Sequence, residues 1–145
     1  MPAHASRIPE TRPLSEQERT LLRWMVEESS GIGSGLSTQL ERTTVAARCG
    51  CGCASIDLAV DDTEEDKKEP MDLIADYAWK TKAGNLCGAY LFTRRGRLAG
   101  LDLWSIDGAE TPSALPAIQA LFPLANLQKG DPVGTDNSGA SRLRV

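Results

Sequence analysis

The sequence lacks three features, and each absence argues against a class of protein. It contains a single histidine, His4, near the start of the chain. Serine and cysteine hydrolases use a histidine as general base, so neither kind of catalysis is expected of the folded part. No apolar run approaches the roughly 18 residues that span a membrane. There is also no excess of basic residues, and a net charge of −4 disfavours general nucleic-acid binding.

The rest of the composition is that of an ordinary globular protein. Apolar residues make up 41% of the 145 residues and charged residues 25%, as in most soluble domains. We expect a single domain over residues 14–122, after a mobile arm over residues 1–13 and before a disordered tail over residues 123–145. The first residues lack the apolar core of a secretory signal, so we expect a cytoplasmic protein with reduced cysteines.

An amphipathic helix is predicted over residues 15–29. Ser15 is a good N-cap residue, and Glu18 completes a capping box. Apolar residues then recur at helical spacing, at Leu21, Leu22, Met25 and Val26. A short second helix is predicted over residues 36–42.

Alternating apolar residues predict five strands, over residues 43–48, 54–60, 71–80, 86–93 and 98–105. The first two form a hairpin and the last three an antiparallel meander. We therefore expect an α+β fold, in which an antiparallel sheet of about five strands carries the N-terminal helix on one face. The acidic segment 61–69 is predicted to be a solvated loop, and the turn of arginines at 94–97 a solvated hairpin tip.

The most unusual segment is residues 48–58, Arg-Cys-Gly-Cys-Gly-Cys-Ala-Ser-Ile-Asp-Leu, which we call the cysteine hairpin. A turn of four residues, 50–53, keeps apolar side chains on one face of the ladder. That register pairs Cys49 with Ala54, Ala47 with Ile56 and Val45 with Leu58. Glycines at two of the four turn positions supply the positive φ that a tight turn needs.

The four cysteines, Cys49, Cys51, Cys53 and Cys87, are candidate metal ligands. Their number matches the four thiolates of a closed zinc site, and a cuprous ion accepts two or three thiolates. The C-x-C-x-C spacing, however, differs from the usual paired zinc knuckles, and Cys87 belongs to a predicted central strand, where a buried thiol is common. The same spacing also differs from the C-x-x-C of thioredoxin-like proteins.

The order of these features resembles a family of small, uncharacterised bacterial proteins. The matching segments are Leu14-Ser-x-x-Glu-x-x-Leu-Leu-Arg-Trp24, Leu40-Glu41 with Val45, the cysteine hairpin, Gly88-x-Tyr-Leu-Phe92 and Gly96-Arg-Leu-x-Gly-Leu-Asp-Leu-Trp-Ser105. The resemblance covers roughly residues 14–122, and it implies the fold and a bacterial origin but no activity.

Three functions follow as hypotheses. The first is a non-enzymatic, cytosolic protein-interaction module of immunity-like or regulatory kind, which contacts an unidentified protein partner through a sheet face or the tip of the cysteine hairpin. The second is a small metal-binding protein that holds zinc or copper with the hairpin thiols. The third is a thiol-redox protein, in which one thiol is far more reactive than the others.

Overall fold

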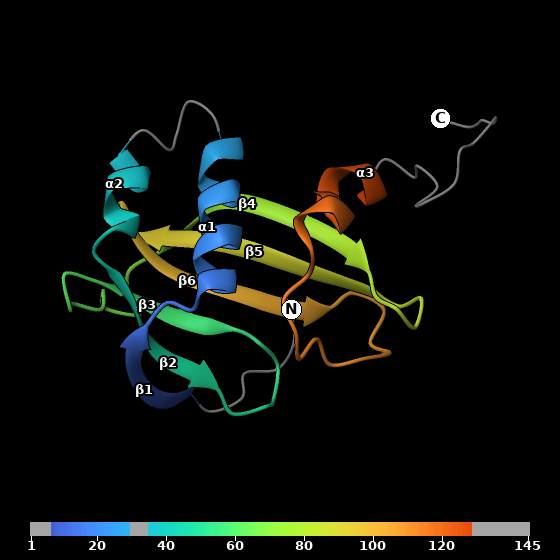
Figure 1. Ribbon diagram of the computed structural model, residues 1–145, viewed down its shortest axis with the longest axis horizontal. Helices are drawn as coiled ribbons and strands as arrows, with labels where there is room; N and C mark the ends of the chain where they lie inside the picture. Colours follow the sequence, from blue (N-terminus) through green and yellow to red (C-terminus); the bar gives the residue numbers. More distant parts are fainter. Residues whose placement is uncertain (1–6, 30–34, 129–145) are drawn as a thin grey trace.

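The computed structural model describes residues 7–29 and 35–128, which form one antiparallel sheet and a few short helices (Figure 1). The strand order is β1-β2-β3-β6-β5-β4-β7. The strands are β1 (Arg7–Pro13), β2 (Thr43–Cys49), β3 (Ile56–Val60), β4 (Met71–Lys80), β5 (Leu86–Arg94), β6 (Arg97–Ser105) and β7 (Phe122–Pro123). The helices are α1 (Glu16–Glu28), α2 (Leu36–Leu40) and α3 (Leu124–Gln128), with a 3-10 turn at Ile118–Ala120.

The predicted architecture, a five-stranded sheet that carries an N-terminal amphipathic helix on one face, is wrong in the size of the sheet and in the share of helix. The structure is mostly a seven-stranded sheet, and its helices are few and short. The two missed strands, β1 and β7, are the edges of the sheet. An edge strand needs only one neighbour and tolerates proline, so β1 with two prolines and β7 with only two residues carry no clear strand pattern.

The hairpin and the meander belong to one sheet. β3 pairs with β6, through Ile56 opposite Leu101 and Asp57 opposite Gly100. This short ladder makes one continuous sheet from strands that are distant in the sequence. The two faces of this sheet therefore run without a break from the cysteine hairpin to β4.

The predicted arm and tail are corrected in the same way. Residues 7–13 form β1, which pairs with β2 on both sides of a register shift between Pro9 and Arg12. Pro123 ends β7, and the next five residues form α3. Composition does not reveal β1 and β7, because main-chain pairing with a neighbouring strand needs no apolar side chain. The remainder of the arm, including His4, the linker residues 30–34 and the tail beyond Gln128 lie outside the described residues.

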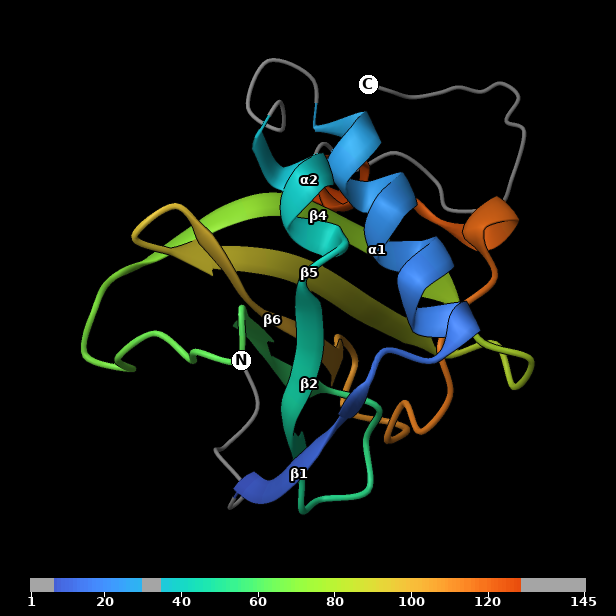
Figure 2. The same ribbon diagram turned by 60° about the vertical axis from the view of Figure 1, so that its left-hand side comes forward.

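The main core lies between the helices and one face of the sheet (Figures 1 and 2). Its buried residues from the helices are Leu21, Leu22, Met25, Val26, Leu36 and Leu40, and those from the central strands include Leu58, Leu91, Leu101 and Leu103. A smaller cluster of Tyr90, Phe92 and Ala99, with Trp104 packed against it, occupies the other face. Successive strand residues point to opposite faces, which separates the two clusters.

The acidic loop and the arginine turn are paired with each other. Glu65 lies 3.1 Å from the Arg97 guanidinium and 3.5 Å from that of Arg95. Asp61 lies 2.9 Å from Arg42, close to the start of the same loop. These charges were predicted to be solvated separately. Ion pairs this close to solvent contribute at most about 1 kcal/mol each, so they fix the path of the loop more than they stabilise the fold.

The start of α1 is tied to β1 through Glu18. The Ser15 hydroxyl accepts a hydrogen bond from the Glu18 N–H at 3.0 Å, and the Glu18 carboxylate accepts one from the Ser15 N–H at 2.8 Å, so the predicted capping box is confirmed. The carboxylate also accepts two hydrogen bonds from Arg12 of β1, at 2.8 and 2.9 Å. These bonds satisfy an acid that is 7% exposed.

This arrangement predicts a pH dependence. Burial raises the pKa of Glu18, but the hydrogen bonds from Arg12 and Ser15 lower it by more. The pKa of Glu18 therefore lies below the ordinary 4.5. A carboxyl group with a lowered pKa stabilises the fold above its unfolded-state pKa, and this contribution disappears as the pH falls through the folded-state value. We expect the stability of the wild type to fall more steeply below pH 4.5 than that of Glu18→Gln.

Urea unfolding at a series of pH values measures the difference. Glu16→Gln, which changes an exposed acid in the same helical turn, is the control and should keep the wild-type slope. Equal slopes for Glu18→Gln and the wild type would contradict the assignment.

Candidate metal centre

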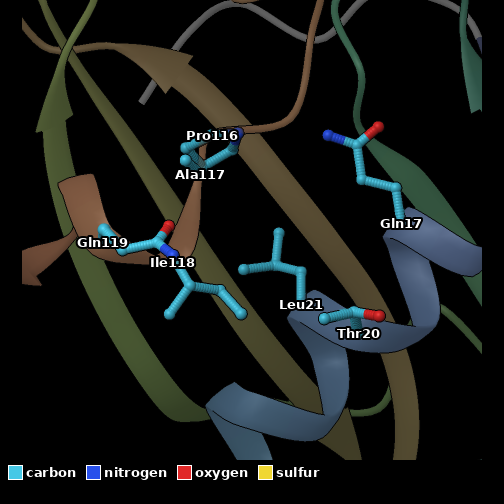
Figure 3. Close-up of a pocket in the computed structure, with 7 residues that line it drawn as sticks. All are labelled: Gln17, Thr20, Leu21, Pro116, Ala117, Ile118 and Gln119. Atoms are coloured by element: carbon cyan, nitrogen blue, oxygen red, sulfur yellow. The ribbon is translucent and has the colours of Figure 1, made fainter.

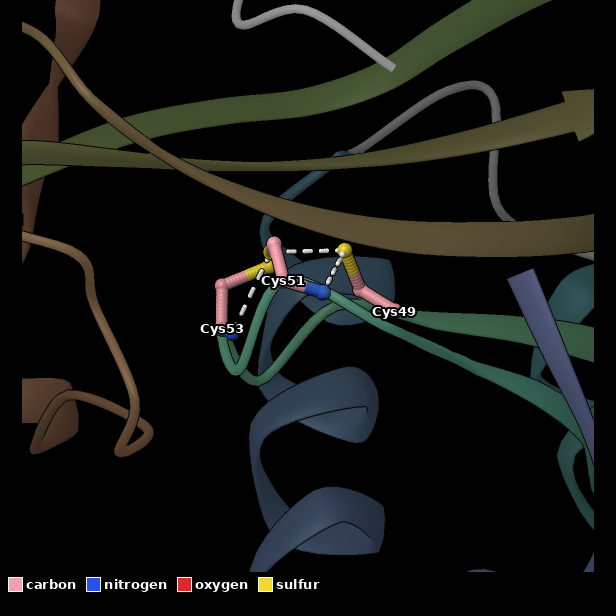
Figure 4. A group of neighbouring side chains, drawn as sticks. All are labelled: Cys49, Cys51 and Cys53. Carbon is pink, nitrogen blue, oxygen red and sulfur yellow. Dashed lines mark hydrogen bonds between the residues drawn. The ribbon is translucent and has the colours of Figure 1, made fainter. Parts of the chain in front are cut away.

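The connection between β2 and β3 brings three cysteines together (Figure 4). The Sγ atoms of Cys49, Cys51 and Cys53 all lie within 4.8 Å of one another. Cys49 ends β2 and is buried, Cys53 is half-buried and Cys51 is exposed. The cluster is therefore anchored on the sheet at one end and open to solvent at the other.

A register shift in β2 decides where Cys49 lies. Val45 opposes Leu58, as predicted, but the next pair along the ladder is Ala47 opposite Asp57. The residue between them, Ala46, is an extra residue in β2. After such a bulge, each side chain of the strand lies on the opposite face of the sheet from the one that a regular strand would give it.

The predicted pairs Ala47–Ile56 and Cys49–Ala54 are therefore wrong. The Cys49 N–H donates instead to the Ser55 carbonyl at 3.2 Å. The sequence pattern could not reveal the shift, because alanine is tolerated on either face of a strand. The shift places Cys49 on the face of the sheet that carries Asp57 rather than on the face that the helices cover.

Hydrogen bonds within the turn hold the three sulfurs close (Figure 4). The Cys51 N–H donates to the Cys49 Sγ and the Cys53 N–H to the Cys51 Sγ, both at 3.3 Å. The Cys49 thiol donates to the Cys51 Sγ at 2.7 Å. Gly52, with a φ of 95°, allows the turn. N–H groups directed at sulfur suit a metal-bound thiolate, which accepts hydrogen bonds and donates none.

The spacing of the sulfurs fits a metal ion after a small opening of the turn. Thiolates in a tetrahedral zinc site, with Zn–S bonds of about 2.3 Å, lie about 3.8 Å apart. The Cys49 and Cys51 sulfurs, at 2.7 Å, would have to separate by roughly 1 Å to reach that spacing. Gly50 and Gly52 flank Cys51 and give the turn the backbone freedom to widen.

Cys87, the fourth predicted ligand, does not belong to this cluster. It is buried on β5, between Trp79 of β4 and Ser105 of β6. Burial raises the pKa of the Cys87 thiol, and the charges of Glu110 and Asp107 raise it further. A buried thiol of raised pKa is a poor ligand and a poor nucleophile at neutral pH. The candidate metal site therefore contains three cysteines and not four.

Sequence reasoning missed Arg7, which lies opposite Cys49 in the β1–β2 ladder. Its guanidinium donates to Asp102 of β6 at 3.1 Å and lies 3.7 Å from Asp57 of β3. Asp57 also accepts a hydrogen bond from Lys67 at 3.2 Å. Arg7 therefore joins three strands beside the thiols. Nothing in its sequence context, a proline-containing stretch, indicated this role.

The cation beside Cys49 is held in its charged form. Burial lowers the pKa of Arg7, but Asp57, Asp102 and Cys49 together raise it above its ordinary value. The Tyr90 hydroxyl donates to Asp102 at 2.9 Å, and burial, followed by the charge of Asp102, raises the pKa of Tyr90. Arg7 thus supplies a fixed positive charge next to the buried end of the cysteine cluster.

A shallow pocket of about 300 Å³ opens elsewhere, between α1 and the segment that precedes β7 (Figure 3). Its lining residues are Gln17, Thr20, Leu21, Pro116, Ala117, Ile118 and Gln119. None of these side chains is titratable, so the pocket offers no acid, base or nucleophile. The cysteine cluster is the better candidate site.

Comparisons with known proteins do not identify the chain: no family model, curated protein or solved structure matches it. The resemblance to a bacterial family therefore remains a prediction. Among the described residues, no helix is both long and apolar enough to cross a membrane. Function has to be argued from the site itself.

The Arg7 network predicts a difference between two arginines of neighbouring strands. Arg7→Met leaves the buried Asp57 with one cation and Asp102 with one hydrogen bond, so we expect a loss of about 1–3 kcal/mol in the free energy of unfolding. Arg48→Met breaks only the exposed pair with Glu10, and should lose less than about 1 kcal/mol. Urea unfolding of the two variants tests this, and equal losses would contradict the role of Arg7 as the partner of the buried Asp57.

Proposed function

We propose that the protein binds one soft metal ion through the thiolates of Cys49, Cys51 and Cys53. The observation that carries this proposal is the mutual approach of the three sulfurs within 4.8 Å. Thiolates select soft and borderline ions such as Cu(I) and Zn(II) over Mg²⁺ or Ca²⁺, which prefer oxygen ligands. A cytoplasmic location, which we propose with it, would keep the thiols reduced.

Cuprous copper fits the cluster better than zinc. Structural zinc sites are closed by four protein ligands, whereas here Cys87 lies apart from the other three cysteines, and no histidine occurs within the described ranges 7–29 and 35–128. Cu(I) is satisfied by two or three thiolates. Zinc would need a fourth ligand from solvent, and Cys51 is exposed enough to allow one.

Charge also favours binding at this position. The thiols must lose their protons to become ligands, so binding releases protons. Three thiolates around Cu(I) leave a net charge of −2, which would be unfavourable in isolation. Arg7, which lies opposite Cys49 and is shared with Asp57 and Asp102, offsets part of this cost.

The test is metal content by native mass spectrometry, on protein purified without a tag or chelator and then loaded with Cu(I) or Zn(II). We expect one ion per chain in the wild type and protection of three thiols from alkylation. Replacing Cys49, Cys51 or Cys53 by serine should remove the third ligand and weaken Cu(I) binding by about tenfold or more. Cys87→Ser is the matched control and should bind like the wild type.

Two outcomes would overturn the proposal. The first is a wild type that takes up neither ion, and the second is a Cys87→Ser variant that binds no better than Cys49→Ser. A metal-free protein in which one thiol reacts far faster than the rest would favour the thiol-redox alternative.

A second candidate function is the interaction module. The observation that supports it is a pair of exposed apolar side chains on one strand, Met71 and Leu73, which are 42% and 52% exposed. Large apolar residues side by side at the surface are typical of contact sites. Self-association is the form of this function that can be tested with the purified protein alone.

A further inference from the structure

The sulfurs of Cys49 and Cys51 lie closer together than two thiolates around one metal ion. Their separation is 2.7 Å (Figure 4), which is roughly 1 Å less than the spacing around zinc. The S–S bond of a disulfide is about 2.05 Å long, so this pair would have to approach by only roughly 0.7 Å to form one. The pair therefore lies between the two states, and a small movement of the turn reaches either of them.

The backbone around this pair allows such a bond to form. Two cysteines can be bridged only where their side chains converge, and the hydrogen bond between the two sulfurs shows that these do. Cys49 is fixed at the end of β2, where its N–H donates to the Ser55 carbonyl. Cys51 lies in the turn between Gly50 and Gly52, whose backbone can adjust. Cys51 is thus the partner that moves.

Cys53, the third thiol of the hairpin, is directed to a different partner. Its thiol donates to the Ser55 hydroxyl at 3.2 Å. That hydroxyl donates to the Leu103 carbonyl at 3.2 Å and accepts from the Leu103 N–H at 2.8 Å, which fixes it on β6. Among the three thiols of the hairpin, Cys49 and Cys51 are therefore the pair that is placed to react.

We propose that Cys49 and Cys51 form a reversible disulfide by exchange with a small-molecule disulfide such as oxidised glutathione, and that this bond releases the metal ion. The inference rests on the proposed metal function and names its regulation by oxidation. The two states exclude each other because they use the same sulfurs. A disulfide leaves Cys53 as the one remaining thiol of the hairpin, whereas Cu(I) needs two or three thiolates.

The exposure of the two thiols sets the order of the exchange. Cys51 is exposed and Cys49 is buried, so the Cys51 sulfur attacks the small disulfide first and breaks its S–S bond. One small thiolate leaves with the proton of Cys51, and a mixed disulfide remains. The Cys49 sulfur then attacks the Cys51 sulfur, and the second small thiolate leaves with the proton of Cys49. The two cysteines lose two electrons, which reduce the small disulfide to two thiols.

The same exchange runs from the metal-bound form, and it can be reversed. With the ion bound, both cysteines already lack their protons, so the leaving thiolates take protons from solvent. A disulfide across a single intervening residue closes a very short loop and adds little stability to the fold. An excess of a small thiol can therefore reduce it again by the reverse of the two steps.

The test begins with metal-free, reduced wild type, which is treated with oxidised glutathione, alkylated in denaturant and mapped by mass spectrometry. We expect a chain that is lighter by two hydrogen atoms before alkylation. Cys53 and Cys87 should then be alkylated, and Cys49 and Cys51 should not. This measurement needs neither a variant nor a metal ion, so it judges the disulfide separately from the metal function.

Two variants separate the roles of the thiols. Cys49→Ser lacks the sulfur that closes the bond and should accumulate the mixed disulfide with glutathione on Cys51. Cys53→Ser is the matched control and should form the disulfide as the wild type does. The pairing would be overturned by a wild type that forms no disulfide or one that includes Cys53, and equally by a Cys53→Ser variant that stops at the mixed disulfide.

Metal uptake by the wild type is then compared before and after oxidation, with whichever of Cu(I) and Zn(II) the reduced protein binds. Oxidation should lower the uptake by about tenfold or more, and reduction should restore it. Equal uptake by the two forms would overturn the regulation but leave the metal function standing. A reduced protein that binds neither ion would overturn the metal function and its regulation together, even where the mapped disulfide is present.

Discussion

The extra residue in β2 is the constraint on which the candidate metal centre depends. Beyond Ala46, the strand presents the opposite set of side chains to each face, so Cys49 leaves the helix-covered side and joins the side of Asp57. Without this extra residue, Cys49 would lie on the helix-covered face, in line with the apolar side chains of β2. With the shift it lies beside Arg7 and a pair of carboxylates.

The two faces of the sheet are stabilised in different ways. The helix-covered face is closed by leucines from two helices and the central strands. The other face, near the cysteine hairpin, depends on charged groups that reach across strands, with Arg7 bridging β3 and β6 from the edge. Buried ionic contacts of this kind fix geometry more than they add stability. The thiols therefore lie against a well-defined polar surface.

How far the sequence predicts this structure varies with the kind of interaction. The start of α1 is predictable because a capping box is local, and both of its members are three residues apart. The strand pairs near the register shifts of β2 and β4 are not predictable from periodicity, because the extra residues there, Ala46 and Ile74, are apolar and fit either face of a strand. The edge strands carry almost no signal, because their partners are main-chain groups of distant segments.

The same distinction applies to the site. The three clustered cysteines follow from their closeness in the sequence, whereas the separation of Cys87 and the approach of Arg7 depend on which strands become neighbours. A count of thiols suggested a four-ligand site. Only the sheet topology shows that Cys87 lies apart from the other three.

The local origin of the three thiols has a thermodynamic consequence. Because Cys49, Cys51 and Cys53 lie within five consecutive residues, they remain neighbours when the chain unfolds. A ligand that binds the folded and unfolded chains with similar affinity does not shift the equilibrium between them. In a zinc finger, by contrast, the ligands come from separate segments and the metal drives folding. Here only the part of the affinity that the fold supplies, through Arg7 and the position of Cys49, would stabilise the domain, so the ion would stabilise it less than zinc stabilises a zinc finger.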